Sequence, residues 1–459
     1  MVKKETRFFV FLKQLIIRKK IHSKLNVIYV SSIILAFLVY SKLLPLPGDY
    51  LISAVPQNEI QTITAKIISN PVKSSDKYYT VKLKVLETKS FSGIISSANG
   101  IFTALIKSQT VESHYPKKLF SIQNSKSFKK SKSHKNIQQS TYQSSSNSII
   151  IESGATIRLS GTFIQSENEV PFLLTEEIFF SDYKNTFTDR IKKYRALCRL
   201  QFKRLMSAWG RAGGLMLALL SSSKEYLEKS MQNAFKLSGL SHILALSGMH
   251  LSLVSTLFGF IENKSTLKTL GLFFKILMVF TFVFFAGFSP SLLRALISLL
   301  ILSACKLLKI RPRNSIFVLS LTFLIHAAIA PQDLTNLGFL LSYGALAGIL
   351  FLSSPVNSII TKIFSPKISG SLSASVSAVT FTAPVSIFAF GFFSPSGIIC
   401  TMFVSPLITI FLYSGICLML LSFLMPCFVS FSSFFVNGIY NLIALIVKIF
   451  SIIPVIKIA

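Results

Sequence analysis

Long apolar runs dominate the second half of the sequence and limit what it can fold into. Eight of them follow residue 239, at about 240–261, 267–287, 291–308, 315–330, 336–353, 372–393, 396–424 and 429–453. Each is close to the roughly 20 residues that a helix needs to cross the hydrocarbon core of a bilayer. The charged fraction of 14% and the mean hydropathy of +0.60 agree with these runs. The sequence therefore predicts a polytopic α-helical membrane protein.

One further candidate span lies near the N-terminus. Residues 1–25 contain eight Lys or Arg and precede an apolar run at 27–44. A signal peptide is the alternative, but no small-residue cleavage site is evident. We expect a basic cytoplasmic N-terminus at 1–25 and an uncleaved first transmembrane helix at 26–45. Counting alternate spans back from the basic loop at 306–313, taken as cytoplasmic, places residues 46–238 outside.

Residues 46–182 have a different pattern. Polar and apolar residues alternate at 63–67, 79–85 and 155–163, which predicts an antiparallel β-barrel or sandwich. The stretch at 108–148 interrupts this pattern and is rich in Ser, Lys and Gln. Because so few of its residues are apolar, we expect it to be a disordered insert.

Residues 183–238 return to helical spacing as a basic linker. An amphipathic helix at 184–206 carries the apolar stripe Phe187, Ile191, Tyr194, Cys198, Phe202 and Leu205. With its many Lys and Arg residues, this helix is typical of one lying on a membrane surface. A second helix is expected to start at a Ser223 cap and to end near 238–239. The formal charge of +31 favours a polyanionic partner or an anionic lipid surface, or it reflects a generally Lys-rich proteome.

Polar residues at the start of the first long apolar run are the main candidate site. His242, Ser247, Gly248 and His250 fall within residues 239–251. Polar groups that enter a bilayer-length helix cost free energy unless they face a bundle interior or a water-filled path. Arg294 lies about one turn into another apolar run, where it either snorkels to the interface or holds a phosphate. Small and hydroxyl residues near Ser342 and Tyr343 are explained equally by close helix packing.

The same residues argue against an enzyme. The sequence contains no HExxH motif, and acidic residues are almost absent from the apolar runs, so we expect no metal and no cofactor. Ser247 and His250 are spaced as helix-surface neighbours, but a nucleophilic triad also needs an orienting acid and an oxyanion hole. The hydroxyls, imidazoles and one Arg instead favour a path through which an anion passes.

Four ordered stretches resemble the ComEC-type family of competence membrane channels, which move single-stranded DNA into the cytoplasm. Residues 239–250 are similar to its G-L-S-H-L-L-A-I-S-G-L-H motif. Residues 287–295, 338–348 and 391–406 resemble its other three motifs in the same order. Thr401 stands where the last family motif has Asn. The sequence ends at Ala459 after the last run, so we expect a form lacking the C-terminal metallo-β-lactamase-like domain that many members carry.

The resemblance implies roles for particular residues and partners. The external β domain would be OB-like, and the helices of 239–459 would form the channel bundle. Residues along the substrate path would be His242, Ser247, Gly248, His250, Arg294, Ser342, Tyr343 and Thr401. The DNA backbone would be contacted by Lys192, Lys193, Arg195 and Arg199.

The partners would be single-stranded DNA, membrane lipids, a separate DNA-receptor protein outside and a helicase or ATPase motor inside. Assembly as a homo-oligomer is left open, and the location would be the cytoplasmic (inner) membrane. A transporter of another anionic envelope substrate and a membrane-anchored assembly protein are the alternatives.

Overall fold

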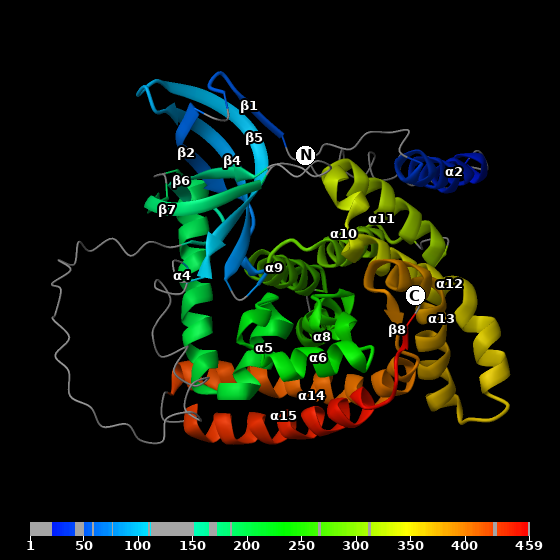
Figure 1. Cartoon of the computed structure of the whole chain (residues 1–459). Helices are drawn as coiled ribbons and strands as arrows, with labels where there is room; N and C mark the ends of the chain where they lie inside the picture. Colours follow the sequence, from blue (N-terminus) through cyan, green and yellow to red (C-terminus); the bar gives the residue numbers. More distant parts are fainter. Residues whose placement is uncertain are drawn as a thin grey trace, which may run out of the picture.

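A β-rich part precedes a helical part in the computed structural model of the chain (Figure 1). The structure describes residues 21–41, 50–56, 59–75, 77–108, 111, 151–164, 172–183, 186–264, 268–310, 314–425 and 429–457. Nearly all of the insert expected at 108–148, and most of the basic N-terminus, lies outside these residues. The order of the two parts confirms the fold class that the sequence predicts.

The β-rich part is built on a ring of five strands. These are β2 (Ile60–Ile67), β4 (Tyr78–Ser90), β5 (Ile95–Lys107), β6 (Thr156–Ile164) and β7 (Phe172–Asp182). Antiparallel pairs join β2 to β4, β4 to β5, β7 to β6 and β6 to β2. A parallel pair between β5 and β7 closes the ring. The short strands β1 (Tyr50–Ser53) and β3 (Val72–Lys73) extend its edges by pairing with β5 and β4.

The alternating sequence explains why these strands close around a core. Along β4, Tyr79, Val81 and Leu83 are buried, whereas Lys82 and Lys84 between them are exposed. Successive side chains of a strand point to opposite faces, so the apolar set fills the ring and the lysines face outward. This arrangement confirms the period-two reading of the sequence.

The helical part contains the predicted apolar helices. The helices are α8 (Gly248–Lys264), α9 (Lys268–Ala286), α10 (Pro290–Leu307), α11 (Ser315–Ile329), α12 (Leu337–Ile360), α13 (Pro366–Phe390), α14 (Ser396–Leu424) and α15 (Val429–Ser451). Within the described residues, six are long and apolar enough to cross a membrane, namely α9, α10, α12, α13, α14 and α15. The chain is thus a multi-pass membrane protein. Shorter apolar helices occur in α11 and in α2 (Ile21–Tyr40).

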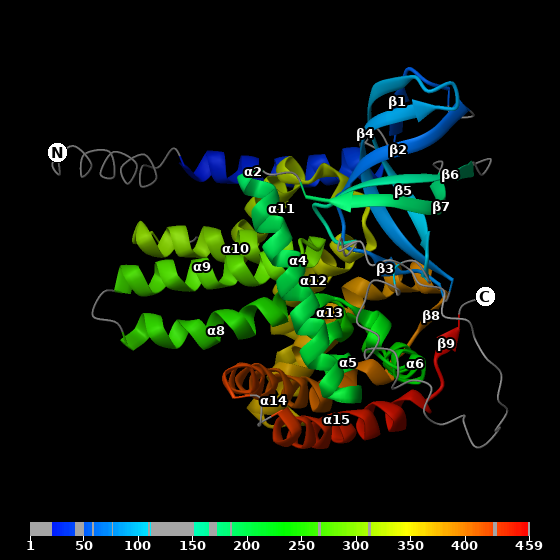
Figure 2. The same ribbon diagram turned by 90° about the vertical axis from the view of Figure 1, so that its left-hand side faces the viewer.

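Helix α4 (Phe187–Ala208) connects the two parts. The helices α8, α9 and α10 run side by side, and α4 crosses them between the barrel and α15 (Figures 1 and 2). Ala196 of α4 belongs to the core of the barrel, whereas Phe202 and Met206 belong to the core of the helical part. One helix is therefore anchored in both cores.

A sharp corner follows α4 at Trp209. Gly210 has a φ of +60°, a left-handed value that favours glycine, and it begins α5 (Gly210–Ser221). Trp209 is fully buried, and its Nε1 donates to Ser432 Oγ at 3.1 Å. Asn437 Nδ2 donates to the Trp209 carbonyl at 2.9 Å. These bonds dock the corner against α15.

The segment between α5 and the first long helix is more broken than the sequence predicts. A short 3-10 turn, η3 (Lys224–Tyr226), precedes α6 (Lys229–Leu237), and Ser223 makes no side-chain cap. The single helix expected over 240–261 is wrong as well. In its place are α7 (Ser241–Leu244) and α8, separated by Ala245 in an extended conformation.

Candidate functional site

Two of the four polar stretches meet through their glycines. A Cβ atom built on Gly239 would lie 3.0 Å from Gly397 Cα, so the two backbones are in direct contact. Ser394 Oγ donates to the Leu237 carbonyl at 2.7 Å beside this contact. The stretches at 239–250 and 391–406, which lie far apart in sequence, are thereby held together.

The other two stretches join the same group. A Cβ atom on Gly248 would lie 2.9 Å from the terminal NH2 of Arg294. Ser291 Oγ, one turn earlier on α10, donates to the Gly338 carbonyl of α12 at 3.2 Å. The structure therefore brings all four stretches into one connected set.

The break between α7 and α8 is held by His250. Both the backbone N–H and the hydroxyl of Ser247 lie near His250 Nδ1, at 3.3 and 3.2 Å. Because the N–H must donate, Nδ1 accepts, and the neutral ring carries its proton on Nε2. His250 thus accepts from the N–H that precedes α8, as the acidic or amide side chain of a capping box does. His250 is 1% exposed, and its Nε2 has no hydrogen-bond partner among the described residues.

A cavity of about 430 Å³ begins at this point and follows α10. Polar, small and leucine side chains line it from α8 (Gly248, Leu251, Ser252, Ser255), α9 (Leu272, Lys275), α10 (Arg294, Ala295, Ser298, Leu299, Leu302, Ser303, Lys306) and α12 (Leu346). On α10 the lining residues recur every three or four positions, so they share one helix face. Arg294 and Lys306 are twelve residues apart, which on a helix corresponds to about 18 Å.

Arg294 lies at the end of this cavity that is next to Gly248. Its guanidinium lies over the ring of Tyr343, 6.0 Å from the centroid, which is cation–π geometry. Its Nε is buried and has no hydrogen-bond partner among the described residues. No carboxylate in the described part of the chain pairs with Arg294. Gly248 leaves room for the guanidinium, since any side chain there would meet it.

Two residues that the sequence analysis missed support Tyr343. Its hydroxyl lies 3.3 Å from His326 Nδ1, and His326 Nε2 lies 3.2 Å from Asp333 Oδ2. His326 is fully buried on α11, and Asp333 belongs to the 3-10 turn η4 (Pro331–Thr335). The chain of contacts runs from Arg294 through an aromatic face to a carboxylate. A histidine inside an apolar run was the available signal.

The remaining path residues lie elsewhere. His242 is exposed on α7, and its Nδ1 contacts the Gly239 carbonyl at 3.1 Å. Thr401 Oγ1 donates to the Gly397 carbonyl one turn back, at 2.6 Å. Ser342 is half-buried on α12 and does not line the cavity. Of the eight predicted path residues, Gly248 and Arg294 line the cavity, and Tyr343 contacts Arg294.

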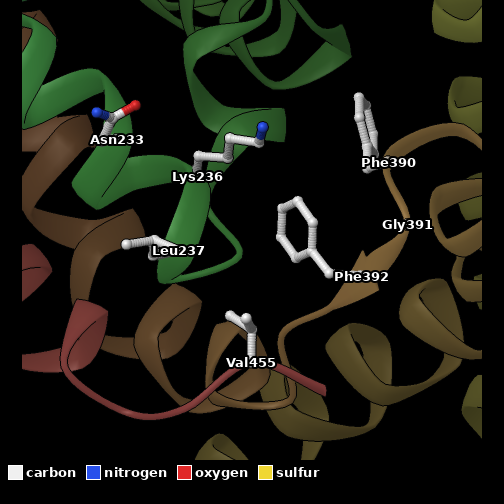
Figure 3. A pocket seen from close by; sticks show the side chains of 7 residues that line it. All are labelled: Asn233, Lys236, Leu237, Phe390, Gly391, Phe392 and Val455. Atoms are coloured by element: carbon white, nitrogen blue, oxygen red, sulfur yellow. The ribbon is translucent and has the colours of Figure 1, made fainter. Parts of the chain in front are cut away.

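A second hollow of about 380 Å³ lies between α6, the turn after α13 and the C-terminal segment. Figure 3 shows Lys236 and Phe392 facing each other across it, with Phe390 on one wall and Val455 on another. Lys236 Nζ is 5.3 Å from the Phe392 ring centroid. The pairing of Phe392 with Lys457 fixes one wall through the two-stranded sheet of β8 (Phe392–Phe393) and β9 (Ile456–Lys457).

The basic face of α4 differs from the expectation. The first half of its apolar stripe faces outward, with Phe187 78% and Tyr194 68% exposed, whereas Phe202 is buried in the core of the helical part. Arg199 and Lys203 are turned inward and are 3% and 2% exposed, whereas Arg190 and Arg204 remain exposed. Lys192 packs against Gly154, whereas Lys193 is exposed. In this structure Arg199 is therefore closed to a DNA phosphate, because it is buried against Glu152.

Glu152 is the centre of this buried charge. Its carboxylate lies 3.1 Å from Lys203 Nζ and 3.4 Å from Arg199 Nε. Burial alone would raise the pKa of Glu152, but the charges of Lys203 and Arg199 outweigh burial and hold it below its ordinary value. Burial beside Arg199 also lowers the pKa of Arg195. Within the described residues, no group of three or more His, Cys, Asp or Glu side chains could hold a metal ion.

A family model described as "Competence protein" matches residues 219–459, which is more than half of the chain. The chain belongs to this family. The match contains all four polar stretches and confirms the ComEC-type resemblance of the sequence.

Two curated relatives are more distant. An uncharacterised protein of Aquifex aeolicus (strain VF5) is 29% identical over 216 residues, covering 47% of this chain and 49% of the relative. ComE operon protein 3 of Bacillus subtilis (strain 168) is 28% identical over 144 residues, covering 31% of this chain and 18% of the relative. The chain thus spans about half or less of the length of these relatives. No solved structure matches the chain significantly.

Proposed function

We propose that this chain is a membrane channel that moves single-stranded DNA across the cytoplasmic membrane during natural competence. The observation that carries the proposal is the cavity along α10, where Arg294 meets no carboxylate of the described residues and hydroxyls continue toward Lys306. A desolvated guanidinium is costly to keep without a partner, and its planar donors match a phosphate. A polyanion passing along this face would meet one cation at each end and serine hydroxyls between them.

The barrel supports a role in receiving the strand. Its ring order β2-β4-β5-β7-β6, antiparallel except for β5 with β7, is the order of an OB-like barrel. Such barrels bind single strands through basic outer faces and aromatic stacking. Lys82 and Lys84 project from the outer face of β4 and would attract the phosphate backbone. Of the predicted DNA contacts on α4, Lys193 stays exposed to take part.

The membrane arrangement is part of the proposal. We infer that the N-terminus is cytoplasmic and that the barrel, α4 and the start of α8 are external. The outward stripe of Phe187, Ile191 and Tyr194 on α4 supports contact with the lipid surface, since such side chains bury themselves at an interface. The membrane potential opposes entry of a negative strand, so a separate helicase or ATPase inside would pull it. A separate receptor outside would deliver the DNA.

The chain would act as a channel rather than as an enzyme. Ser247 and His250 are in contact, but His250 Nδ1 also accepts the Ser247 N–H, and the ring is buried. No acid orients His250 in the described part of the chain. The pair is therefore better explained as the start of α8 than as a nucleophile and its base.

The test is recovery of labelled single-stranded DNA from the cytoplasm. Four strains are compared: intact, deleted, Arg294→Ala, and the control Arg211→Ala. Arg211 forms an exposed ion pair with Glu228 at 2.7 Å, and its loss should change little. Loss of entry in the deletion strain and a drop of about 30-fold with Arg294→Ala are expected, since a charge-assisted bond contributes about 2 kcal/mol.

Unchanged DNA entry in the deletion strain would remove DNA import from the proposal. The same cavity would then suit another anionic envelope substrate, whose loss from the deletion strain would be the positive sign. Normal function of a strain that keeps the barrel tethered without the helical bundle would favour an assembly role.

A further inference from the structure

A buried ion cluster joins the barrel to α4. Glu152 precedes β6 and is 2% exposed, as is Lys203, and Arg199 is 3% exposed. Because charges are so costly to bury, a cluster of this kind is stable only with its geometry intact. A single carboxylate from the barrel therefore fixes the position of two cations on α4.

Arg199 extends this cluster to the end of α9. Its NH1 donates to the Phe285 carbonyl at 2.8 Å and to the Ala286 carbonyl at 3.3 Å. The last carbonyls of a helix lack partners within the helix and carry partial negative charge, so a cation stabilises them. The guanidinium of α4 thus caps α9 while its Nε faces Glu152.

The turn that follows α9 leads directly to Arg294. Gly287 has a φ of +110°, and the nearest side chains to a Cβ built there are Arg195 and Asn70. Pro290 then begins α10, which places Arg294 about one turn later. The short segment from Ala286 to Arg294 has little conformational freedom. The position of the Ala286 carbonyl therefore limits the position of Arg294.

We propose that Glu152 is a positioning residue for Arg294: by holding Arg199 on the end of α9, it fixes the α9–α10 turn and so sets the guanidinium at the mouth of the cavity. The barrel is thereby coupled mechanically to the helical path. The inference rests on the proposed function only where it concerns DNA, since the geometry itself can be tested with small reagents.

The experiment measures the electrostatic potential in the cavity. Ser252 lines the cavity and is exposed, and it is replaced by Cys in a chain whose five native cysteines are changed to Ala. The probes are two methanethiosulfonate reagents of similar size, one carrying a sulfonate and the other a trimethylammonium group. The ratio of their reaction rates reports the local potential, and Arg294→Gln calibrates the contribution of the guanidinium.

Glu152→Gln is expected to lower the sulfonate-to-ammonium ratio by about threefold, as Arg294 moves away from the cavity. The direct effect of removing a negative charge has the opposite sign, because it would raise the ratio. The direction of the change therefore separates displacement of Arg294 from simple loss of charge.

Asp189→Asn is the matched control. Asp189 is also a buried carboxylate at the junction, where it pairs with Lys66 of the barrel at 2.6 Å, but within the described residues it makes no ion pair or hydrogen bond with the α9–α10 turn. The sulfonate-to-ammonium ratio of the Asp189→Asn variant should not fall. An unchanged or raised ratio in Glu152→Gln, or an equal fall in Asp189→Asn, would overturn the proposal.

Arg199→Lys provides a second test if Glu152→Gln does not reach the membrane. Lysine keeps the charge, but its single ammonium cannot reproduce the guanidinium contacts with both Glu152 and the Phe285 carbonyl. An intermediate ratio is expected, and a wild-type ratio would contradict the coupling. Because no DNA enters this assay, its result stands whether or not the chain conducts DNA.

Discussion

Arg199 and Arg294 lie on either side of the same turn, and each guanidinium lies over an aromatic ring, yet among the described residues only Arg199 pairs with a carboxylate. Arg199 is buried against Glu152 and donates to two carbonyls at the end of α9. Arg294 stands at the edge of a cavity, with an aromatic ring beneath it and no carboxylate contact in the described part of the chain.

The difference shows that Arg199 has a structural role, whereas the charge of Arg294 can interact with a molecule in the cavity. A paired, buried cation is held beside its counter-charge and holds elements together. An unpaired cation at a cavity keeps its donors directed at whatever enters. A series of contacts through Tyr343 and His326 links Arg294 to the carboxylate of Asp333. The guanidinium is stabilised without being neutralised.

The largest expected effect contrasts the two arginines in stability. Arg199→Leu should lower the free energy of unfolding by about 3 kcal/mol, because it breaks a buried ion pair from one side. Arg294→Leu should change it by less than about 1 kcal/mol, since an apolar side chain removes an uncompensated charge. Unfolding in detergent can be followed by the fluorescence of Trp209, the single tryptophan of the chain. Equal destabilisation by the two substitutions would contradict the distinction between Arg199 and Arg294.

A substitution that keeps the charge of Arg294 but changes its shape tests whether charge alone is sufficient. Arg294→Lys should reduce recovery of labelled single-stranded DNA about tenfold, because an ammonium lacks the planar fork and stacks poorly on a ring. The same change at Arg211 serves as the control and should have no effect. Wild-type recovery in Arg294→Lys would mean that charge alone suffices.

Acidic pH should weaken the ion cluster around Glu152. The pKa of Glu152 is held below its ordinary value of 4.5, so the stability it contributes is present above that value and is lost as the pH falls through the lowered one. The free energy of unfolding should therefore fall in acid, with a slope from this group of up to about 1.4 kcal/mol per pH unit. Glu152→Gln should remove this part of the slope. An identical slope in the variant would assign the acid sensitivity to other groups.

The ring beneath Arg294 should matter more than its hydroxyl. Tyr343→Leu is expected to reduce DNA recovery about fivefold, as a cation–π contact contributes about 1 kcal/mol. Tyr343→Phe keeps the ring and loses the contact with His326, so a reduction of about twofold is expected. If the phenylalanine variant were the more impaired of the two, the link to His326 and Asp333 would be the important one.

The smallest effect is expected at Gly248. A methyl group there would lie 2.9 Å from the Arg294 NH2, the movable end of a side chain, so the helix tolerates it while the guanidinium shifts. Gly248→Ala should lower DNA recovery about twofold and leave stability unchanged or slightly raised. Gly438 on α15 has nothing within 4 Å of such a methyl group and is the matched control. A similar loss in Gly438→Ala would point to a general effect of alanine in these helices.

The sequence predicts the elements well because periodicity and hydropathy act locally. Alternation in β4 marked the barrel, and apolar length marked the spans. Arg294 was recognisable because a charge in an apolar run needs an explanation. Gly248 was recognisable because its motif lies at the start of an apolar run.

The orientation of α4 could not be predicted in the same way. Periodicity shows which side chains share a face, but it does not say which face is buried. Arg199 and Lys203 turn inward to pair with Glu152, and Glu152 lies 47 positions before Arg199 in the chain. The same limit hid the contact between Tyr343 and His326, which depends on how α11 and α12 pack.

The seam of the barrel has a consequence of its own. The ring closes through two residue pairs between β5 and β7, Ala104 with Leu173 and Leu105 with Leu174. Amide hydrogens here should exchange with solvent before those of the longer β4–β5 ladder, because local opening begins where the fewest bonds must break. Ala104 and Leu173 are both fully buried, so opening the seam would uncover the barrel interior and two free strand edges. An extended segment of another protein could pair there without unfolding the remaining strands.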